Sequence, residues 1–566
     1  MKNIYIIILL LSFGQSEEIA SQNLNFVWAK QLGGTARDYG HSVAVDAIGN
    51  VYTTGIFSGT ADFDPSDETF NLTAGAFSDI FLSKLDNNGN FIWAKNIVGG
   101  SSGYNPIITV DASGNIYITG EFNGTADFDP SDATFNLTSA GSYDAFISKL
   151  DNSGNFIWAK NMGGESADFI SSIVLDTSGN VYTTGEFQGT ADFDPNEGVF
   201  NLTSAGSRDI FISKLDNNGN FIWAKSIGGL GNDFGFSLTL DATGNVYTTG
   251  GFQGTADFDP SDATFNLTSP GSLNIFISKL DNNGNFIWAK SMVGESGSDL
   301  GRSIAVDAIG NVFTIGYFQY SVDFDPGAGV FYMTTDGRLL SFISKLDNNG
   351  NFIWAKAIDN RGTSMALDVT GNIFITGAFS GTVDFDLGTG TFNLVAPLGG
   401  GIFISKLDNN GNFIWAKSMG GTNGTGSGNW IALSVAGNVY ITGGFVDTVD
   451  FDPSDGTFIL TSLGDDIFVE KLCQITTSTS INDQDNKYKI AMWPNPSKGL
   501  VFIKCEGLST SSVKLIDNLG RLLFEDNSIT PDGVVRIFHI DKFPPGIYHI
   551  EIAGKDFRRA LAIIKN

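Results

Sequence analysis

Short runs of β-branched and aromatic residues alternate with polar turns along most of the chain. In one stretch such runs occupy residues 107–110, 116–119, 145–150 and 156–160. Turns of the form Asp-x-x-Gly-Asn separate them, and Gly and Asn tolerate the positive φ that tight hairpins need. No segment keeps the spacing of an amphipathic helix. The pattern predicts antiparallel strands joined by tight turns, with an added hairpin at residues 125–138.

This pattern occurs seven times. The tripeptide Trp-Ala-Lys recurs with spacings of 65, 65, 65, 65, 66 and 61 residues, starting at Trp28, Trp93, Trp158, Trp223, Trp288, Trp354 and Trp415. Asp-Phe-Asp and Lys-Leu recur equally often and in a constant order. A unit of this length with four strands is typical of a β-propeller blade carrying a hairpin insertion.

The two ends of the repeat complement each other. The chain enters at residues 25–30, which form the last strand of a unit, whereas the seventh copy stops at residues 467–472 without that strand. The N-terminal strand can therefore complete the seventh blade, and such closure removes exposed sheet edges. An open solenoid would instead show capping repeats. We predict an all-β fold with a seven-bladed β-propeller at residues 23–473, closed by its N-terminal strand.

Two stretches of the first unit resemble a known repeat. They are residues 45–55 (Val-Asp-Ala-Ile-Gly-Asn-Val-Tyr-Thr-Thr-Gly) and residues 79–86 (Asp-Ile-Phe-Leu-Ser-Lys-Leu-Asp). The units resemble the bacterial SBBP β-propeller repeat family over residues 23–473. This resemblance implies the fold, but the family has no single activity, so no chemistry follows from it.

The N-terminus carries an export signal. A basic residue, an apolar run at residues 4–13 and small residues after it predict a secretory signal peptide at residues 1–16. The run is too short to span a bilayer as a helix. Since no other long apolar segment occurs, we expect no transmembrane segment after signal removal.

The repeat stops at Cys473, and a polar linker is predicted at residues 474–486. Residues 487–566 alternate β-rich runs with turns, which predicts a small C-terminal β-sandwich. Residues 493–496 (Trp-Pro-Asn-Pro), residues 545–548 (Pro-Gly-Ile-Tyr) and the basic, apolar ending resemble the type A sorting domain of type IX secretion. The resemblance implies that the type IX secretion machinery is a partner, and that the protein is secreted or held at the cell surface.

The charge of the chain narrows the range of partners. With 61 acidic and 32 basic residues, the formal net charge is −29. Such a chain repels nucleic acid and anionic lipid, so we expect no nucleic-acid partner. The two cysteines, Cys473 and Cys505, do not make a disulfide framework.

An acidic triad in the added hairpin is the clearest candidate for chemistry. Its first two Asp residues are two apart on an expected strand, so their carboxylates should face one side. Calcium accepts clustered oxygens of this kind, whereas Asp also caps hairpin turns, and both interpretations stay open. The candidate calcium ligands are Asp62, Asp64, Asp67, Asp127, Asp129, Asp132, Asp257, Asp259, Asp262, Asp450, Asp452 and Asp455.

No catalytic constellation is visible in the repeat. His41 is its only histidine and is expected in a loop or packing role, and its arginines occupy unlike positions in the units. A catalytic pair should break the repeat symmetry, whereas the Asp triads follow it. We therefore expect a non-enzymatic scaffold that binds an unknown glycan or protein, at departures from the repeat such as Trp430. The alternative is a secreted, carboxylate-dependent glycan-active enzyme.

Overall fold

The computed structural model describes residues 23–99, 106–397, 399–421, 424–434, 436–475, 489–493, 500–506, 512–517, 522–526, 535–540, 543, 546–554 and 557–565. The expected signal peptide and nearly all of the expected linker lie outside these residues. The chain divides into two compact units. One is Leu24–Gln474, the repeat domain, and the other, made of Met1–Asn23 and Ile475–Asn566, contains the C-terminal domain. No helix in the described ranges is long and apolar enough to cross a membrane.

Each repeat unit forms a four-stranded antiparallel meander, as the run-and-turn pattern predicts. The strands of units one to three are β2 (Tyr39–Val45), β3 (Val51–Asp62), β4 (Asn71–Leu85) and β5 (Phe91–Gly99); β6 (Ile107–Val110), β7 (Ile116–Asp127), β8 (Asn136–Leu150) and β9 (Phe156–Gly164); and β10 (Phe169–Leu175), β11 (Val181–Phe187), β14 (Asp209–Leu215) and β15 (Phe221–Gly229).

Units four to seven follow the same plan. Their strands are β16 (Phe234–Leu240), β17 (Val246–Asp257), β18 (Asn266–Leu280) and β19 (Phe286–Gly294); β20 (Leu300–Val306), β21 (Val312–Phe318), β24 (Leu340–Leu346) and β25 (Phe352–Ile358); β26 (Arg361–Leu367), β27 (Ile373–Phe379), β30 (Gly401–Leu407) and β31 (Phe413–Met419); and β32 (Thr425–Leu433), β33 (Val439–Asp450) and β34 (Ile459–Ile475), with β1 (Asn23–Gly34) beside β34.

The added hairpin extends the second and third strands of a unit. In units one, two, four and seven it continues them without a break, as in β3 and β4. In units three, five and six it is a separate pair of short strands: β12 (Thr190–Asp192) with β13 (Asn201–Thr203), β22 (Ser321–Asp323) with β23 (Tyr332–Thr334), and β28 (Thr382–Asp384) with β29 (Asn393–Val395).

Hydrophobic cores lie between successive units. In one of them Tyr52 of unit one packs with Ile116 and Phe146 of unit two, all at 0% exposure. The tryptophan at the end of a unit covers the turn of the next, and Trp28 Nε1 donates to the carbonyl of Asn87 at 3.2 Å. Packing between units, rather than a ligand role, therefore accounts for the repeated tryptophans.

A buried lysine also joins each unit to the next. Lys84 Nζ lies 4.9 Å from the centroid of the Tyr52 ring and donates to the carbonyl of Asn152 at 2.7 Å. Lys471 of unit seven makes the same bond to Asn87 of unit one at 2.8 Å. Both the cation–π contact and the bond to a carbonyl keep the buried ammonium group solvated by protein.

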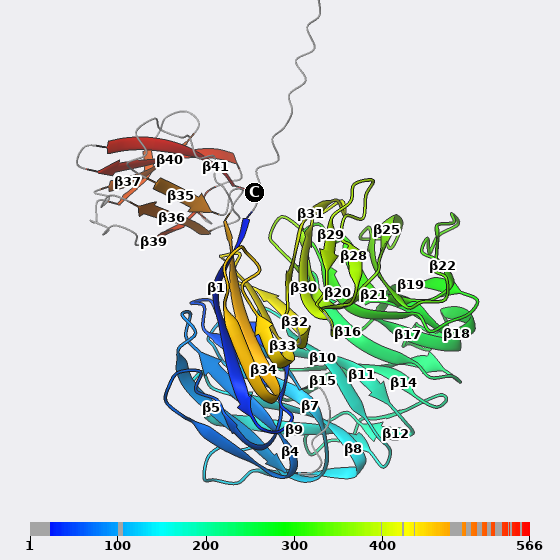
Figure 1. Cartoon of the computed structure of the whole chain (residues 1–566). Coiled ribbons are helices and arrows are strands. Elements are labelled where there is room, and N and C mark those ends of the chain that lie inside the picture. Colours follow the sequence, from blue (N-terminus) through cyan, green and yellow to red (C-terminus); the bar gives the residue numbers. More distant parts are fainter. Residues whose placement is uncertain are drawn as a thin grey trace, which may run out of the picture. The chain divides into compact units, whose positions relative to one another are not determined.

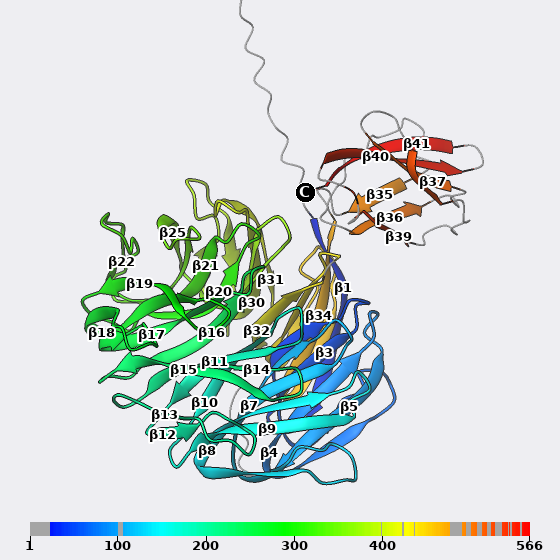
Figure 2. The same cartoon turned by 180° about the vertical axis from the view of Figure 1, so that it is seen from behind.

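Strand β1 links the start of the repeat domain to its end. It lies in one sheet with β34, and Figure 1 shows the two side by side in blue and orange. The innermost strands also contact one another in succession from β2 to β32, and β32 in turn contacts β2. Asn429 of β32 donates to the carbonyl of Gly40 in β2 at 2.9 Å. Figure 2 shows the inner strands of the repeat domain from behind.

The C-terminal domain consists of two antiparallel sheets in the described residues. One contains β35 (Lys489–Trp493), β36 (Leu500–Glu506) and β39 (Val535–His539), and the other β37 (Ser512–Asp517), β38 (Leu522–Asp526), β40 (Gly546–Gly554) and β41 (Phe557–Lys565). Val501 and Ile503 of the first sheet share a core with Val513, Leu515 and Ile550 of the second. Two sheets around one core agree with the predicted β-sandwich.

Candidate functional site: the central cavity

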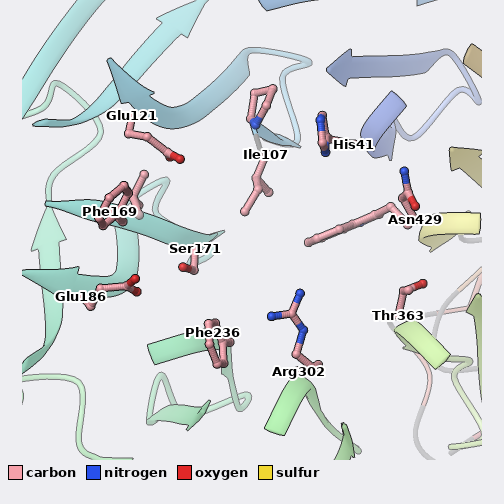
Figure 3. A pocket seen from close by; sticks show the side chains of 13 residues that line it. His41, Ile107, Glu121, Phe169, Ser171, Glu186, Phe236, Arg302, Thr363 and Asn429 are labelled. Carbon is pink, nitrogen blue, oxygen red and sulfur yellow. The ribbon is translucent and has the colours of Figure 1, made fainter. Parts of the chain in front are cut away.

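The repeat domain contains a cavity of about 390 Å³ among the innermost strands of its units. We call it the central cavity. Each of the seven units contributes one residue at the same position of the repeat, and Figure 3 labels six of these residues, all but Pro106, in order around the cavity. They are His41, Pro106, Ser171, Phe236, Arg302, Thr363 and Asn429.

A β-bulge directs these side chains inward. In unit three the register of β10 against β11 shifts between Ile170 and Ser172, so Ser171 is the extra residue. The same shift occurs around His41, Phe236, Arg302, Thr363 and Asn429. A bulge inserts one unpaired residue and re-aims its side chain. We call these seven positions the bulge positions; Pro106, immediately before β6, occupies the corresponding place in unit two.

The bulge positions vary while their surroundings repeat. Ser follows the bulge position in units one, three, four, five and six, and Gly precedes it in units one, four, five, six and seven. The bulge positions themselves carry His, Pro, Ser, Phe, Arg, Thr and Asn, seven different residue types. A scaffold that repeats and a lining that does not are what a specific binding site requires.

A glycine on the second strand recurs opposite the bulged first strand. Gly185 of β11 faces Ile170 of β10, and a Cβ added at Gly185 would lie 1.9 Å from the carbonyl oxygen of Phe169. The equivalent distance from Gly250 to the carbonyl of Phe234 is 1.8 Å. Glycine is therefore needed on the second strand because the bulged first strand brings its backbone so close.

Gly185→Ala is expected to destabilise the repeat domain by about 3 kcal/mol or more, because the added methyl group meets backbone that cannot rotate away. Thermal or urea unfolding measures this. Gly120→Ala, at the same repeat position in unit two, is the matched control. A Cβ added at Gly120 would lie 3.0 Å from a side-chain atom of Phe146 and 3.6 Å from the nearest backbone atom, so a smaller loss of stability is expected. Equal losses in both variants would contradict the bulge explanation.

Two glutamates from second strands extend the lining. Glu121 of β7 and Glu186 of β11 occupy one repeat position, and both are buried at 4% and 7% exposure. The equivalent residues elsewhere include Ile56, Gly251 and Tyr317, so the glutamates depart from the repeat. Figure 3 shows both carboxylates on one side of the cavity, with Arg302 on another.

Glu186 has a perturbed environment. Burial raises the pKa of Glu186 to about 7, against the opposing effect of Arg208 and Arg302. Arg208 Nη1 lies 3.3 Å from Glu186 Oε1, while Oε2 is buried without a hydrogen-bond partner among the described residues. Arg208 also lies over the Phe169 ring at 5.1 Å. This carboxyl group therefore changes its protonation state near neutral pH.

The remaining lining combines aromatic and neutral polar groups. Burial lowers the pKa of His41 to about 4, so its imidazole is neutral at physiological pH. Phe169, Phe236 and Trp430 also line the cavity. Aromatic faces beside a few polar groups are typical of pockets for small organic ligands. His41 was expected to pack or to lie in a loop, but the bulge turns it toward the cavity.

The predicted calcium ligands lie elsewhere, in the added hairpins. Asp62 ends β3 and Asp64 lies beyond it, so the expectation that both residues belong to one strand is wrong. The cause is local: Asp62 Oδ1 accepts bonds from the amides of Asp64 at 3.0 Å and Phe70 at 2.8 Å. Asp64 in turn accepts from Ser66 at 3.0 Å, and Asp67 is exposed. The first two Asp residues thus act as turn caps.

The other triads have the same arrangement of bonds at Asp127 and Asp129, at Asp257 and Asp259, and at Asp450 and Asp452. Within the described residues no three His, Cys, Asp or Glu side chains form a group that could hold a metal ion. Calcium binding by these hairpins stays a prediction.

Buried carboxylates also occur in pairs outside the cavity lining. Asp144 and Asp168 are 0% and 1% exposed. They lie close together, because a Cβ added at Gly163 would be 2.6 Å from Asp144 Oδ1 and 3.0 Å from Asp168 Oδ2. Burial, with a smaller contribution from the charge of Asp144, raises the pKa of Asp168 to about 7. Asp209 with Asp233, and Asp466 with Asp38, repeat the arrangement in other units. We call these three sets the carboxylate pairs.

Comparison with known proteins identifies two parts of the chain. Residues 27–55 and 157–186 match the family described as Beta-propeller repeat, and residues 491–566 match the Secretion system C-terminal sorting domain. The chain therefore carries propeller repeats and a type IX sorting domain, as both resemblances implied. The sorting domain supports interaction with the type IX secretion system and marks the protein as secreted or exposed at the cell surface.

Similarity to individual proteins is distant. An uncharacterized WD repeat-containing protein of Acanthamoeba polyphaga mimivirus is 24% identical over 477 residues, which cover 70% of this chain and 34% of that protein. The chain thus spans about a third of the length of that relative. A structure of a protein of unknown function from Bacteroides caccae is similar with a TM-score of 0.27 and 8% identity, covering 60% of this chain and 89% of the other.

Proposed function

We propose that the repeat domain is a closed seven-bladed propeller that, after export, binds a small polar ligand in its central cavity without catalysing a reaction. Closure is supported by β1 beside β34, by the bond from Lys471 to Asn87, and by the bond from Asn429 to Gly40. Each contact joins the seventh unit to the first.

The observation that carries the proposal is the set of bulge positions. Six units use the same bulge to direct one residue into one cavity, Pro106 takes the corresponding place in unit two, and no two units use the same residue. If the cavity were only packing, copies of this repeat would be expected to keep a common residue there, as they do in their cores. A volume of about 390 Å³ suits a ligand the size of one or two sugar rings.

Ser171→Trp tests the proposal. Its indole is expected to occupy much of the cavity and to weaken ligand binding at least about tenfold, equal to ~1.4 kcal/mol. The fold should tolerate it because unit four already holds Phe236 at the same position. A ligand that binds the native state raises the temperature midpoint of unfolding. The measurement is therefore the increase in this midpoint on addition of soluble glycans and small acids. Ser66→Trp, in an exposed hairpin turn, is the control. Unchanged binding by Ser171→Trp would rule out the cavity.

A glycan-active enzyme is the second candidate. Glu121 and Glu186 break the repeat symmetry, as a catalytic pair should, and the pKa of Glu186 at about 7 suits a general acid. Hydrolysis of a polysaccharide by the purified protein, abolished in Glu186→Gln, would favour this function over non-catalytic binding. Binding without product formation would favour the first proposal.

A further inference from the structure

The arginines of the repeat domain fall into two groups. Arg37 lies 3.1 Å from Asp465, Arg208 lies 3.3 Å from Glu186, and Arg338 lies 2.6 Å from Asp359. The guanidinium groups of Arg302 and Arg361 form no ion pair or hydrogen bond with another described residue, although the charge of Arg302 acts on Glu186 at longer range. Both side chains are exposed, so their guanidinium groups are accessible to a ligand from solvent.

Both unpaired arginines lie at the centre of the domain. Arg302 occupies a bulge position in the central cavity, and Arg361 lines an adjoining cavity of about 440 Å³. Thr363 lines both cavities, so they are neighbours. Burial raises the pKa of Tyr317, and the charges of Arg302 and Arg361 both oppose this rise, which places both groups near the same phenol.

The side chain of Arg302 packs on an aromatic ring but forms no ion pair with a carboxylate of the described residues. Its guanidinium carbon lies 4.9 Å from the centroid of the Phe236 ring. Contact with an aromatic face fixes the guanidinium group while leaving its N–H donors free for a planar anion. Asp465, which lines the adjoining cavity, already accepts bonds from Arg37 and Tyr39. An anion that enters the central cavity would therefore meet donors that no protein carboxylate uses.

The other wall limits which anion fits. Glu121 and Glu186 are buried there and would repel a ligand with two or more negative charges. They accept hydrogen bonds from hydroxyl or ammonium groups. A ligand with one negative charge at one end and donors at the other satisfies both walls.

We propose that the central cavity recognises the carboxylate of a small organic acid rich in hydroxyl or amino groups, with Arg302 as its main donor. This inference rests on the proposed function and specifies its ligand class. Arg361 contributes attraction from the adjoining cavity. The ligand chemistry is shared by acidic sugars and by free amino acids.

Isothermal titration of the mature protein separates these sources. The probes are glucuronate and galacturonate, their neutral counterparts glucose and galactose, and serine, a free amino acid with a single carboxylate. At least one carboxylated probe should bind, and its neutral counterpart should not. Arg302→Gln should weaken that binding at least about tenfold. Arg338→Gln, which removes a surface arginine paired outside the cavity, should bind like the wild type.

Three results would overturn the inference. Equal binding of neutral and acidic sugars would do so, as would an Arg302→Gln variant that binds the acid with unchanged affinity. Failure of every carboxylated probe at millimolar concentration would also do so. The proposed function is judged separately by Ser171→Trp: if neutral sugars bind and this variant abolishes their binding, the cavity remains the site and only the ligand class is wrong.

Discussion

Between pH 5 and pH 8 the repeat domain should lose stability, so that its unfolding midpoint is highest in mildly acidic buffer. The cause is the carboxylate pairs and Asp299. Burial raises the pKa of Asp168 and of Asp299 to about 7, and that of Asp38 and Asp233 to about 6, from the ordinary 3.8. Because the folded state holds these protons more tightly than the unfolded state, their contribution is complete below about pH 4 and is lost as the pH rises through 6 to 7.

A single group is enough to make the effect measurable. A pKa raised from 3.8 to about 7 at Asp168 corresponds to roughly 4 kcal/mol lost by pH 8. The Asp residues of the Asp-x-x-Gly-Asn turns act in the opposite sense. Hydrogen bonds from Asn155 and Ser153 lower the pKa of Asp151, despite the opposing effect of partial burial, so its contribution is lost only below about pH 4. Together these groups place the optimum near pH 4 to 5.

Asp144→Asn separates the carboxylate pairs from general charge repulsion. Unit four already has Asn274 at this position, so the substitution should be accommodated. Removing the charge beside Asp168 should stabilise the domain by roughly 1–3 kcal/mol at pH 8 and much less at pH 5. Asp67→Asn, at an exposed position, should change neither value. Urea unfolding at the two pH values measures all three proteins; a pH-independent midpoint would refute the explanation.

Removal of residues 24–34 should unfold or aggregate the repeat domain. Strand β1 buries Leu24, Trp28 and Leu32 at 3%, 7% and 1% exposure, in the cores on both sides of unit seven. Losing these side chains costs roughly 8 kcal/mol or more, which is comparable to the total stability of a typical domain. The loss would also leave β34 as an exposed sheet edge. Size-exclusion chromatography with light scattering and thermal unfolding detect both effects.

Relocating the strand provides the control. In units one, three, four, five and six the turn Asp-Asn-Asn-Gly-Asn directly follows the Lys-Leu pair, so residues 26–34 are joined after Leu472 through the same turn. If β1 is the fourth strand of a closed seventh blade, this permuted chain should recover the monomeric state and most of the lost stability. A deletion that leaves the domain monomeric and equally stable would contradict closure, and so would a permuted chain that fails to recover.

The strands could be predicted from the sequence because their signals are local. Alternation of β-rich runs with Asp-x-x-Gly-Asn turns is sufficient, and the turns form as expected: Asp86 Oδ1 accepts bonds from the amides of Asn88 at 2.7 Å and Asn90 at 2.9 Å. Seven regular markers indicated the number of units. The place of β1 followed from counting strands at the two ends.

The central cavity was not predicted, because its cause is not local. Whether a strand contains a bulge depends on pairing with its neighbour, and Ser171 reads as an ordinary strand residue. The signal was present when units are compared by position, since His41, Arg302 and Asn429 occupy one column of the repeat. The acidic triads attracted attention because their chemistry is recognisable in the sequence; in the structure Asp62 Oδ1 accepts bonds from two backbone amides, and calcium binding there stays a prediction.

The bulge has a consequence for how such a protein changes over generations. The residue that we propose to meet the ligand is the one residue of its strand without a pairing partner, so replacing it leaves the ladder, the cores and the lysine bonds intact. Duplication of a unit copies the scaffold, and a single codon then sets what the new copy contributes. Recognition can diverge one codon at a time, without the loss of stability that most mutations cause.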